Sequence, residues 1–225
     1  MDRKIPLVIL AVVLVLLALA ILAPGGRKVD TAPKLPWQIE ILADGAPRVF
    51  ELTLGQTPLN QAVQVLSDAP TLSLFRSPEG VFSIEAYFQR VALSGLRADF
   101  ILTLEIDQAV AAQIFERGLR ISQLSSGGKK VNLASNDVDL AMSSPIRHIT
   151  YIPATDLDAK LIERYFGKPE QIIDDPAGGK HWLYPDKGLD ITLNPDTKEV
   201  FQYVHPQHFN QLLEPLLNSA PAGEH

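Results

Sequence analysis

The sequence predicts an α+β fold: an N-terminal transmembrane helix followed by two small tandem modules, each a helix packed on an antiparallel sheet. Three observations support it. Residues 5–23 form an uncharged apolar run, residues 156–204 show helical periodicity followed by three strand-like runs, and residues 37–107 repeat that order of elements. With 225 residues, the chain can bury one large core or two smaller ones.

The apolar run at residues 5–23 follows a short N-terminus, residues 1–4. As a helix it would be about 28 Å long, close to the hydrocarbon thickness of a bilayer. Pro24, Gly25 and Gly26 then end the helix. A secretory signal cleaved after Ala20 is the alternative, whereas lipidation is excluded because the chain has no cysteine.

Basic residues flank the predicted span on both sides, so the positive-inside rule is nearly balanced. We expect the short N-terminus to stay inside. This makes the chain a single-pass protein of the inner (cytoplasmic) membrane with a periplasmic C-terminal domain.

Charge is uneven along the chain. Residues 35–225 carry 15 basic and 24 acidic residues, a net charge of −9, without a basic cluster. Such a domain is a poor partner for nucleic acid or anionic lipid. Besides the membrane at residues 5–23, we expect another cell-envelope protein as the partner.

Residues 24–36 contain several prolines without periodicity, which predicts a stiff linker. Trp37 either lies at the membrane interface or begins the first strand and packs in the core. Within the first module, residues 37–107, the pattern predicts a hairpin, a helix that begins at Thr57-Pro58 and ends before Pro70, and strands at 81–88 and 93–106.

Residues 108–150 predict a connecting helix, a loop and a strand. Asp107 caps the helix and Gly118 ends it. Residues 122–130 have the composition of a mobile loop, and residues 146–152 predict a strand that leads into the second module.

The second module, residues 151–206, begins with a helix capped by Thr155 or Asp156 and ended by Gly167. Strands are predicted at 181–184, 189–193 and 199–204, with turn residues between them. The final segment, residues 207–225, predicts a short helix and a disordered tail. The apolar stripe of the module's helix comprises Leu157, Leu161, Ile162, Tyr165 and Phe166.

The two modules suggest an internal repeat. A shift along the chain that places Thr57 on Asp156 also places Pro70 on Pro169 and Gly80 on Gly179. Cap, terminating proline and turn then coincide, which is typical of related units in tandem.

A helix ending in F-G-K-P, a strand H-W-L-Y and a closing V-F-Q-Y-V give residues 156–204 a resemblance to a known family. They resemble the SmpA/OmlA-type domain of the outer-membrane β-barrel assembly machinery. The resemblance implies a non-enzymatic, envelope-facing α+β module. Members of that family carry a lipidated cysteine and usually one copy of the domain, and the chain departs from both features.

No catalytic or cofactor-binding residues are predicted. Cysteine is absent, as are the G-x-S-x-G, phosphate-loop and calcium-loop patterns. His205 and His208 have a metal-ligand spacing, but Pro206 disfavours a helix there, so a solvated corner is favoured over a zinc or copper site. Asp174 and Asp175 suit a turn better than an acid–base pair.

Four aromatic residues make a candidate interaction patch: Trp182 and Tyr184 on one strand, and Phe201 and Tyr203 on another. They either form an exposed surface for a partner or half of a small core. The function we expect is a non-catalytic, protein-binding scaffold. The alternative is an enzyme or a small-ligand-binding domain with a cleft between the modules, and clustered ionisable groups there would favour the enzyme.

Overall fold

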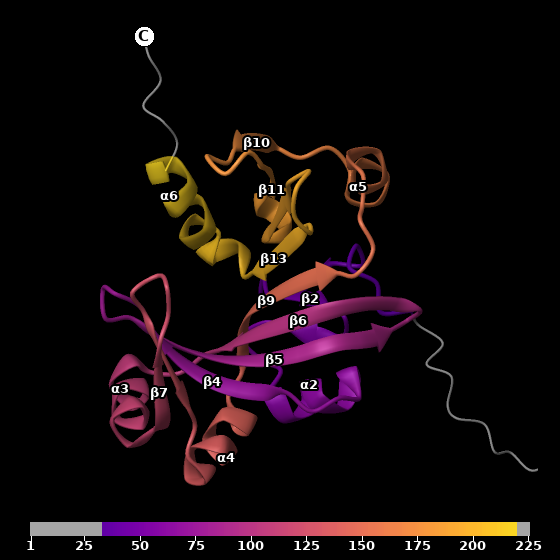
Figure 1. The fold of residues 1–225 in the computed structure, drawn as a ribbon. Helices are drawn as coiled ribbons and strands as arrows, with labels where there is room; N and C mark the ends of the chain where they lie inside the picture. The colour runs from indigo at the N-terminus through magenta and orange to yellow at the C-terminus, as the bar shows by residue number, and fades with distance from the viewer. Residues whose placement is uncertain (1–32, 220–225) are drawn as a thin grey trace, which may run out of the picture. The chain divides into compact units, whose positions relative to one another are not determined.

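A computed structural model describes residues 33–219 (Figure 1). Their strands form a ten-stranded antiparallel sheet in the order β10-β11-β12-β13-β9-β6-β5-β4-β8-β7, and a small sheet in the order β1-β2-β3. The strands are β1 (Glu40–Ile41), β2 (Pro47–Val49), β3 (Leu52–Thr53), β4 (Thr71–Arg76), β5 (Phe82–Leu93), β6 (Leu96–Leu104), β7 (Leu119–Gln123), β8 (Lys129–Asn132), β9 (Ile146–Pro153), β10 (Gln171–Asp174), β11 (Lys180–Tyr184), β12 (Leu189–Leu193) and β13 (Val200–Val204).

The helices of the described residues are short. They are α2 (Leu59–Leu66), α3 (Gln108–Arg117), α4 (Ser135–Ser143), α5 (Ala159–Phe166) and α6 (Asn210–Ser219), with single 3-10 turns η1 (Pro185–Lys187) and η2 (Pro206–His208). Asp107 caps α3 as predicted, since its carboxylate accepts from the backbone N–H groups of Ala109 and Val110. For α5 the cap is Asp158 instead of the predicted Thr155 or Asp156.

The prediction of an α+β fold with two tandem helix-plus-sheet modules is wrong. The described chain is mostly sheet, and strands from both predicted modules share the large one. β9 joins them, because Ile149 pairs with Leu102 of β6 on one side and with Tyr203 of β13 on the other. A hydrogen-bonded ladder on both edges of β9 leaves no boundary at which one sheet ends. The predicted connecting segment likewise contributes β7, β8 and β9 to this sheet.

One side of the large sheet, here called the core face, packs against four helices. Residues of α2, α3, α4 and α5 share one apolar cluster with the core face, which includes Phe88, Phe100, Tyr151 and Phe201. Figure 1 shows α2 and α4 beneath β4 and β5. On the opposite side, here called the outer face, α6 is the only one of these helices in the apolar cluster. Its residues Leu212, Leu213 and Leu216 pack against the buried Leu183, Val204 and Phe209.

A tight turn between β2 and β3 packs a buried ring, that of Phe50, against the core face. Phe50 and Glu51 both have positive φ angles, which is the geometry of a type I′ hairpin turn. The left-handed conformation costs free energy at a residue with a side chain. Burial offsets that cost at Phe50, because its ring contacts those of Phe100, Tyr151 and Tyr203.

The prediction of a single-pass inner-membrane protein with a periplasmic domain is corrected as well. Within residues 33–219, no helix is long and apolar enough to cross a bilayer. The longest of them, α3 and α6, have 10 residues each, whereas a span needs about 20. The expected transmembrane helix at residues 5–23 lies outside the described residues, as do residues 1–4.

Candidate functional site

A groove of about 510 Å³ opens between α5, the end of β9 and the turn that joins β5 to β6. Its lining comes from Pro36 at the end of the predicted linker, from Trp37 and residues 95–97 of the predicted first module, and from residues between 151 and 166 in the predicted second module. The groove therefore draws on both halves of the chain that the sequence had assigned to separate modules. Its volume is within the range of small-molecule sites, about 300–1,000 Å³.

Helix α5 forms one wall of the groove. Asp158 caps the helix by accepting from the backbone N–H of Leu161 at 2.7 Å, and Gly167 ends it with a φ of 84°. Ile162 and Phe166 are buried against the sheet. Leu161 and Tyr165, one step round the helix, line the groove.

The opposite wall is a fixed stretch of chain at residues 34–37. The hydroxyl of Tyr203, which is fully buried, donates to the backbone carbonyl of Pro36 at 2.9 Å. The backbone N–H of Lys34 donates to the Ser94 hydroxyl at 2.7 Å. Both bonds tie this stretch, the end of the predicted linker, to the large sheet. They place Trp37 against α5.

Aromatic rings close one end of the groove. Trp37 stacks on Tyr165 with ring centroids 4.0 Å apart and an interplanar angle of 16°. It also meets Phe166 edge-on, at 6.4 Å. Trp37 is half-buried and packs against the core cluster, as one of its two predicted alternatives had it, but it precedes β1 and does not begin a strand. The membrane-interface alternative stays a prediction.

Buried apolar side chains form the inner lining of the groove. Tyr151 is almost completely buried, and burial raises the pKa of its hydroxyl to about 12, so the group is neutral at physiological pH. The end of β9 is held to β6 by the backbone N–H of Ala154, which donates to the carbonyl of Arg97 at 2.8 Å. Leu96 and Pro153 line the groove beside that bond.

Among the described residues, Arg97 is the only basic or acidic one that lines the groove. Its side chain is exposed and makes no ion pair with another described residue. An apolar cavity with one cationic group suits a ligand with an apolar body and one anionic group. Among the described residues, the lining contains no histidine, aspartate or glutamate.

The candidate interaction patch lies in the core. Tyr184, Phe201 and Tyr203 are at most 5% exposed, and Trp182 packs half-buried against the same cluster. The indole N–H of Trp182 has no hydrogen-bond partner among the described residues. The four side chains do share one side of the sheet, but it is the core face, so they form no exposed patch.

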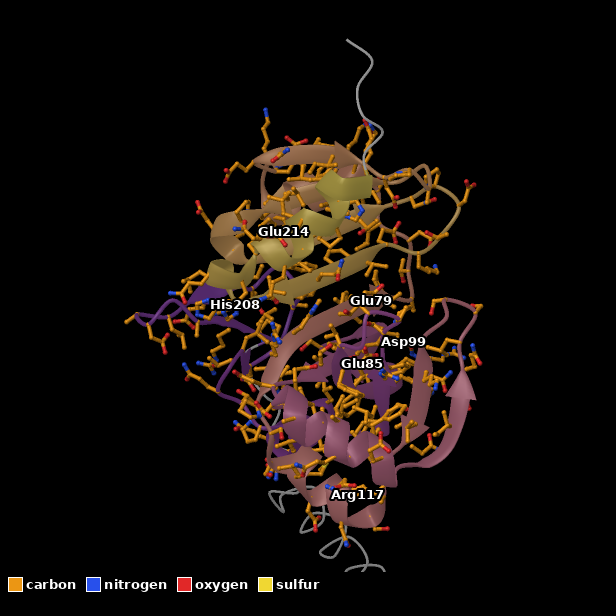
Figure 2. All side chains as sticks on the ribbon, turned by 90° about the vertical axis from the view of Figure 1, so that its left-hand side faces the viewer. Glu79, Glu85, Asp99, Arg117, His208 and Glu214 are labelled. Atoms are coloured by element: carbon orange, nitrogen blue, oxygen red, sulfur yellow. The ribbon has the colours of Figure 1, made fainter. Side chains whose placement is uncertain are left out.

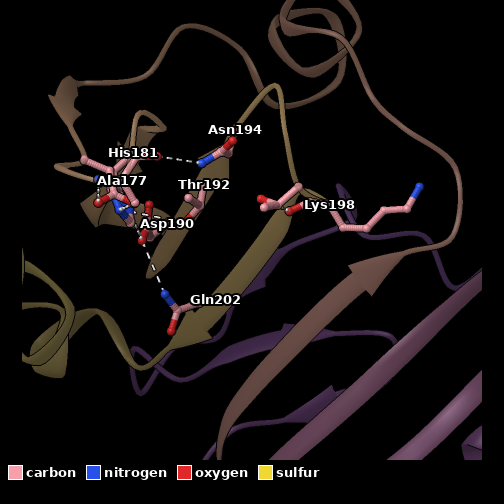
Figure 3. Close-up of polar contacts among 9 residues, drawn as sticks. Ala177, His181, Asp190, Thr192, Asn194, Lys198 and Gln202 are labelled. Carbon is pink, nitrogen blue, oxygen red and sulfur yellow. Dashed lines mark hydrogen bonds and ion pairs between the residues drawn. The ribbon is translucent and has the colours of Figure 1, made fainter. Parts of the chain in front are cut away.

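A polar cluster lies on the outer face of β11–β13 (Figure 3). His181 Nδ1 lies 2.8 Å from the carboxylate of Asp190, which is 1% exposed, and 3.2 Å from the Thr192 hydroxyl. Asp175 approaches His181 Nε2 at 3.8 Å. Burial opposes protonation of His181, but Asp190 and Asp175 outweigh it and raise the pKa. The cluster links β11 to β12, and the side-chain amide of Gln202 on β13 donates to the same Asp190 carboxylate at 3.5 Å.

The other residues weighed from the sequence, apart from Asp175 beside His181, lie at separate places in the described chain. His205 and His208 have ring centroids 5.6 Å apart, and His205 accepts a hydrogen bond from the backbone N–H of Gln207. No group of three metal-ligating side chains occurs in residues 33–219. Asp174 pairs with Lys180, and Asp175 accepts from the backbone N–H of Ala177 within a turn.

Sequence reasoning did not find the groove, although it marked several of its residues. The apolar stripe of α5 contained a usable signal, since Leu161, Ile162, Tyr165 and Phe166 spread over an arc of about 140° at about 100° per residue. Only part of that arc is needed for the core. Nothing in the sequence marked Arg97 as a binding residue, because an exposed arginine after a turn is common.

Comparisons with known protein families, with curated proteins and with solved structures found no match for this chain. The resemblance of residues 156–204 to the SmpA/OmlA-type domain therefore stays a prediction. The interpretation of the groove rests on its own geometry.

Proposed function

We propose that this protein is a non-catalytic binding protein for a small amphipathic molecule. The apolar body of the ligand lies between α5 and the Trp37 wall. A single anionic group, such as a carboxylate, lies at Arg97. The sequence left open, as the alternative to a protein-binding scaffold, an enzyme or a small-ligand-binding domain. The function proposed here is the second of these two.

The observation that supports the proposal best is the composition of the groove. About 510 Å³ of space is lined by mainly apolar and aromatic side chains, and Arg97 is the only charged residue of the described chain that lines it. Burying apolar ligand surface there supplies affinity without directional contacts. An arginine can then select for an anion through paired N–H donors.

The rigidity of the walls also supports a binding role. The Tyr203–Pro36 hydrogen bond, the Ala154–Arg97 backbone bond and the Asp158 cap each fix a different wall. A preformed site loses less conformational entropy when a ligand binds.

Tryptophan fluorescence tests the proposal on the full-length chain. The chain has two tryptophans, so a Trp182→Phe variant leaves Trp37 as the only reporter, at the groove. Decanoate and decanol, which share a chain length but differ in charge, are titrated separately. We expect saturable changes with both, and tighter binding of decanoate.

The Arg97→Gln variant isolates the charge. Decanoate affinity should fall about tenfold, which corresponds to about 1.4 kcal/mol, while decanol affinity stays unchanged. Arg48→Gln, another exposed arginine away from the groove, serves as the matched control and should change neither. Absence of a saturable response to both probes in the folded protein would reject the proposal. Equal losses for decanoate and decanol would reject the role of Arg97.

The protein-binding function expected from the sequence stays a prediction. Its proposed surface does not support it, because Tyr184, Phe201 and Tyr203 are buried. A protein partner would have to use another surface of the described residues.

A further inference from the structure

The stacked rings of Trp37 and Tyr165 lie at the end of the groove that is farther from Arg97. On one wall, the backbone N–H of Ala154 donates to the carbonyl of Arg97 at 2.8 Å, and α5 begins shortly afterwards at its cap, Asp158. Tyr165 is seven residues beyond Asp158, about 10 Å along the helix axis at about 1.5 Å per residue. This wall therefore leads from Arg97 to the rings.

The Trp37 wall runs in the same direction. The backbone N–H of Lys34 donates to the Ser94 hydroxyl at 2.7 Å, and Ser94 lies in the β5–β6 turn, three residues before Arg97. Trp37 follows three residues after Lys34, and an extended chain covers about 10 Å over that length. Both walls thus begin beside Arg97 and converge on the aromatic pair.

The aromatic pair is a barrier to a ligand chain. Its ring centroids are 4.0 Å apart at an interplanar angle of 16°. Carbon atoms in contact are already about 3.5–4.0 Å apart, so no chain passes between the rings. Phe166, which is 4% exposed, meets Trp37 edge-on and supports it from the core. The guanidinium of Arg164 lies 5.9 Å from the centre of the Tyr165 ring, a cation–π contact that favours this position of the ring.

The volume of the groove indicates how long a chain it can hold. A methylene group is about as large as a water molecule, about 30 Å³, so 510 Å³ has room for about 17 heavy atoms. Hexadecanoate reaches this limit, whereas octanoate is well within it. A carboxylate series between these two therefore contains the length at which a chain that starts at Arg97 meets the rings.

We propose that the Trp37–Tyr165 pair determines the length of ligand that the groove accepts, by stopping an apolar chain whose anionic group lies at Arg97. The inference rests on the function proposed for the groove and narrows its ligand class to carboxylates of medium chain length. Methylene groups up to the rings are buried and add affinity, whereas those beyond the rings stay in water and add none.

Calorimetric titration of the full-length chain tests the proposal. The ligands are even-numbered carboxylates from octanoate to hexadecanoate, each below its micelle concentration. A buried methylene strengthens binding about fourfold, so each step of two should strengthen it about fifteenfold. In the parent protein we expect this rise to end before hexadecanoate. In Tyr165→Ala it should continue to hexadecanoate, while octanoate affinity stays unchanged because the short chain does not reach the ring.

The Tyr165→Ala variant should keep the fold, because Tyr165 is 41% exposed and Ile162 and Phe166 hold α5 to the sheet. Tyr165→Phe is the matched control. It keeps the ring and loses a hydroxyl that makes no hydrogen bond within the described residues, so the rise should end at the same length as in the parent. Leu217→Ala removes an exposed apolar side chain from α6, the helix on which Figure 2 labels Glu214, and should change no affinity.

The outcomes separate this inference from the function on which it rests. A folded parent protein that binds no carboxylate would reject both. A rise that continues to hexadecanoate in the parent, or that ends at the same length in Tyr165→Ala, would overturn the length-determining role alone. Loss of octanoate binding in Tyr165→Ala would overturn it as well, since the ring would then contact even the short ligand.

Discussion

Trp37 and Tyr165 stack at 4.0 Å although they are far apart in the sequence, and this pair joins the two walls of the groove. One ring precedes the first strand and the other lies on α5. Because the pair is half exposed, its value comes from ring contact more than from burial. An aromatic pair contributes about 0.5–1.5 kcal/mol beyond its buried area.

A double-mutant cycle measures this contact. We expect Trp37→Ala and Tyr165→Ala each to lower the free energy of unfolding, with a coupling energy of about 1 kcal/mol. Denaturant unfolding of the parent, both single variants and the double variant provides the values. Additive losses would show that the rings do not interact.

Removal of the Tyr203 hydroxyl tests the anchor of the Trp37 wall. Tyr203→Phe leaves the Pro36 carbonyl without its buried partner, and we expect a loss of about 1–2 kcal/mol in the free energy of unfolding. Tyr165→Phe is the matched control, since its hydroxyl makes no hydrogen bond within the described residues, and should change stability little. Equal effects of the two substitutions would contradict the assigned role of the hydrogen bond.

His148 should make the protein less stable in acid. Its pKa is about 4 in the folded state and about 6.5 when unfolded, so the unfolded chain binds more protons between these values. The neutral His148 ring therefore makes its full contribution to the free energy of unfolding above about pH 6.5. As the pH falls towards 4, the free energy of unfolding drops by about 3 kcal/mol in all. Unfolding measured across this range should show a weaker decline for His148→Gln. An unchanged slope in that variant would contradict the prediction.

His181 should act in the opposite direction. Asp190 and Asp175 raise the pKa of His181 in the folded state. The contribution of His181 to the free energy of unfolding is therefore complete below about pH 6.5 and is lost as the pH rises through the raised pKa. We expect His181→Gln to be most destabilising at low pH, and chemical denaturation from pH 5.5 to 8.5 measures this. Thr192→Val, which removes a neutral neighbour of the same ring, should lack that pH dependence.

Gly188 tests the packing of β12 beside η1. An added Cβ would lie 2.0 Å from the carbonyl oxygen of Val204, and the residue has a φ of 62°. We expect Gly188→Ala to cost about 3 kcal/mol or more. Gly55→Ala, also at positive φ but with no atom within 4 Å of the added Cβ, should cost only about 1–2 kcal/mol. Thermal melting of both variants compares them, and equal losses would contradict the predicted clash.

Local patterns predicted many elements. The alternation in 189–193 and the turn residues around it placed β12 correctly, and the apolar stripe of α5 placed that helix within two residues. Residues 122–130 were expected to be a loop, but they include parts of the β7–β8 hairpin. Polar strands at a sheet edge bury few side chains, so they lack the alternation that marks a strand.

The continuous sheet could not be derived in the same way. Periodicity shows which side of a strand is buried, but it does not show which strands lie next to it. Only the pairing of β9 with both β6 and β13 merges the two expected modules. The groove depends on that pairing, because β9 brings Pro153 and Ala154 beside Arg97.

The most direct test of the proposed function is the position of bound decanoate. Intermolecular nuclear Overhauser effects would be recorded between the decanoate chain and the side-chain methyl groups of the full-length protein. We expect contacts to Leu161 and Ile162 and to the Trp37 ring, which line the groove together. Contacts only to the leucines of α6 or to the exposed Ile172, without any to α5, would contradict the assignment of the groove as the binding site.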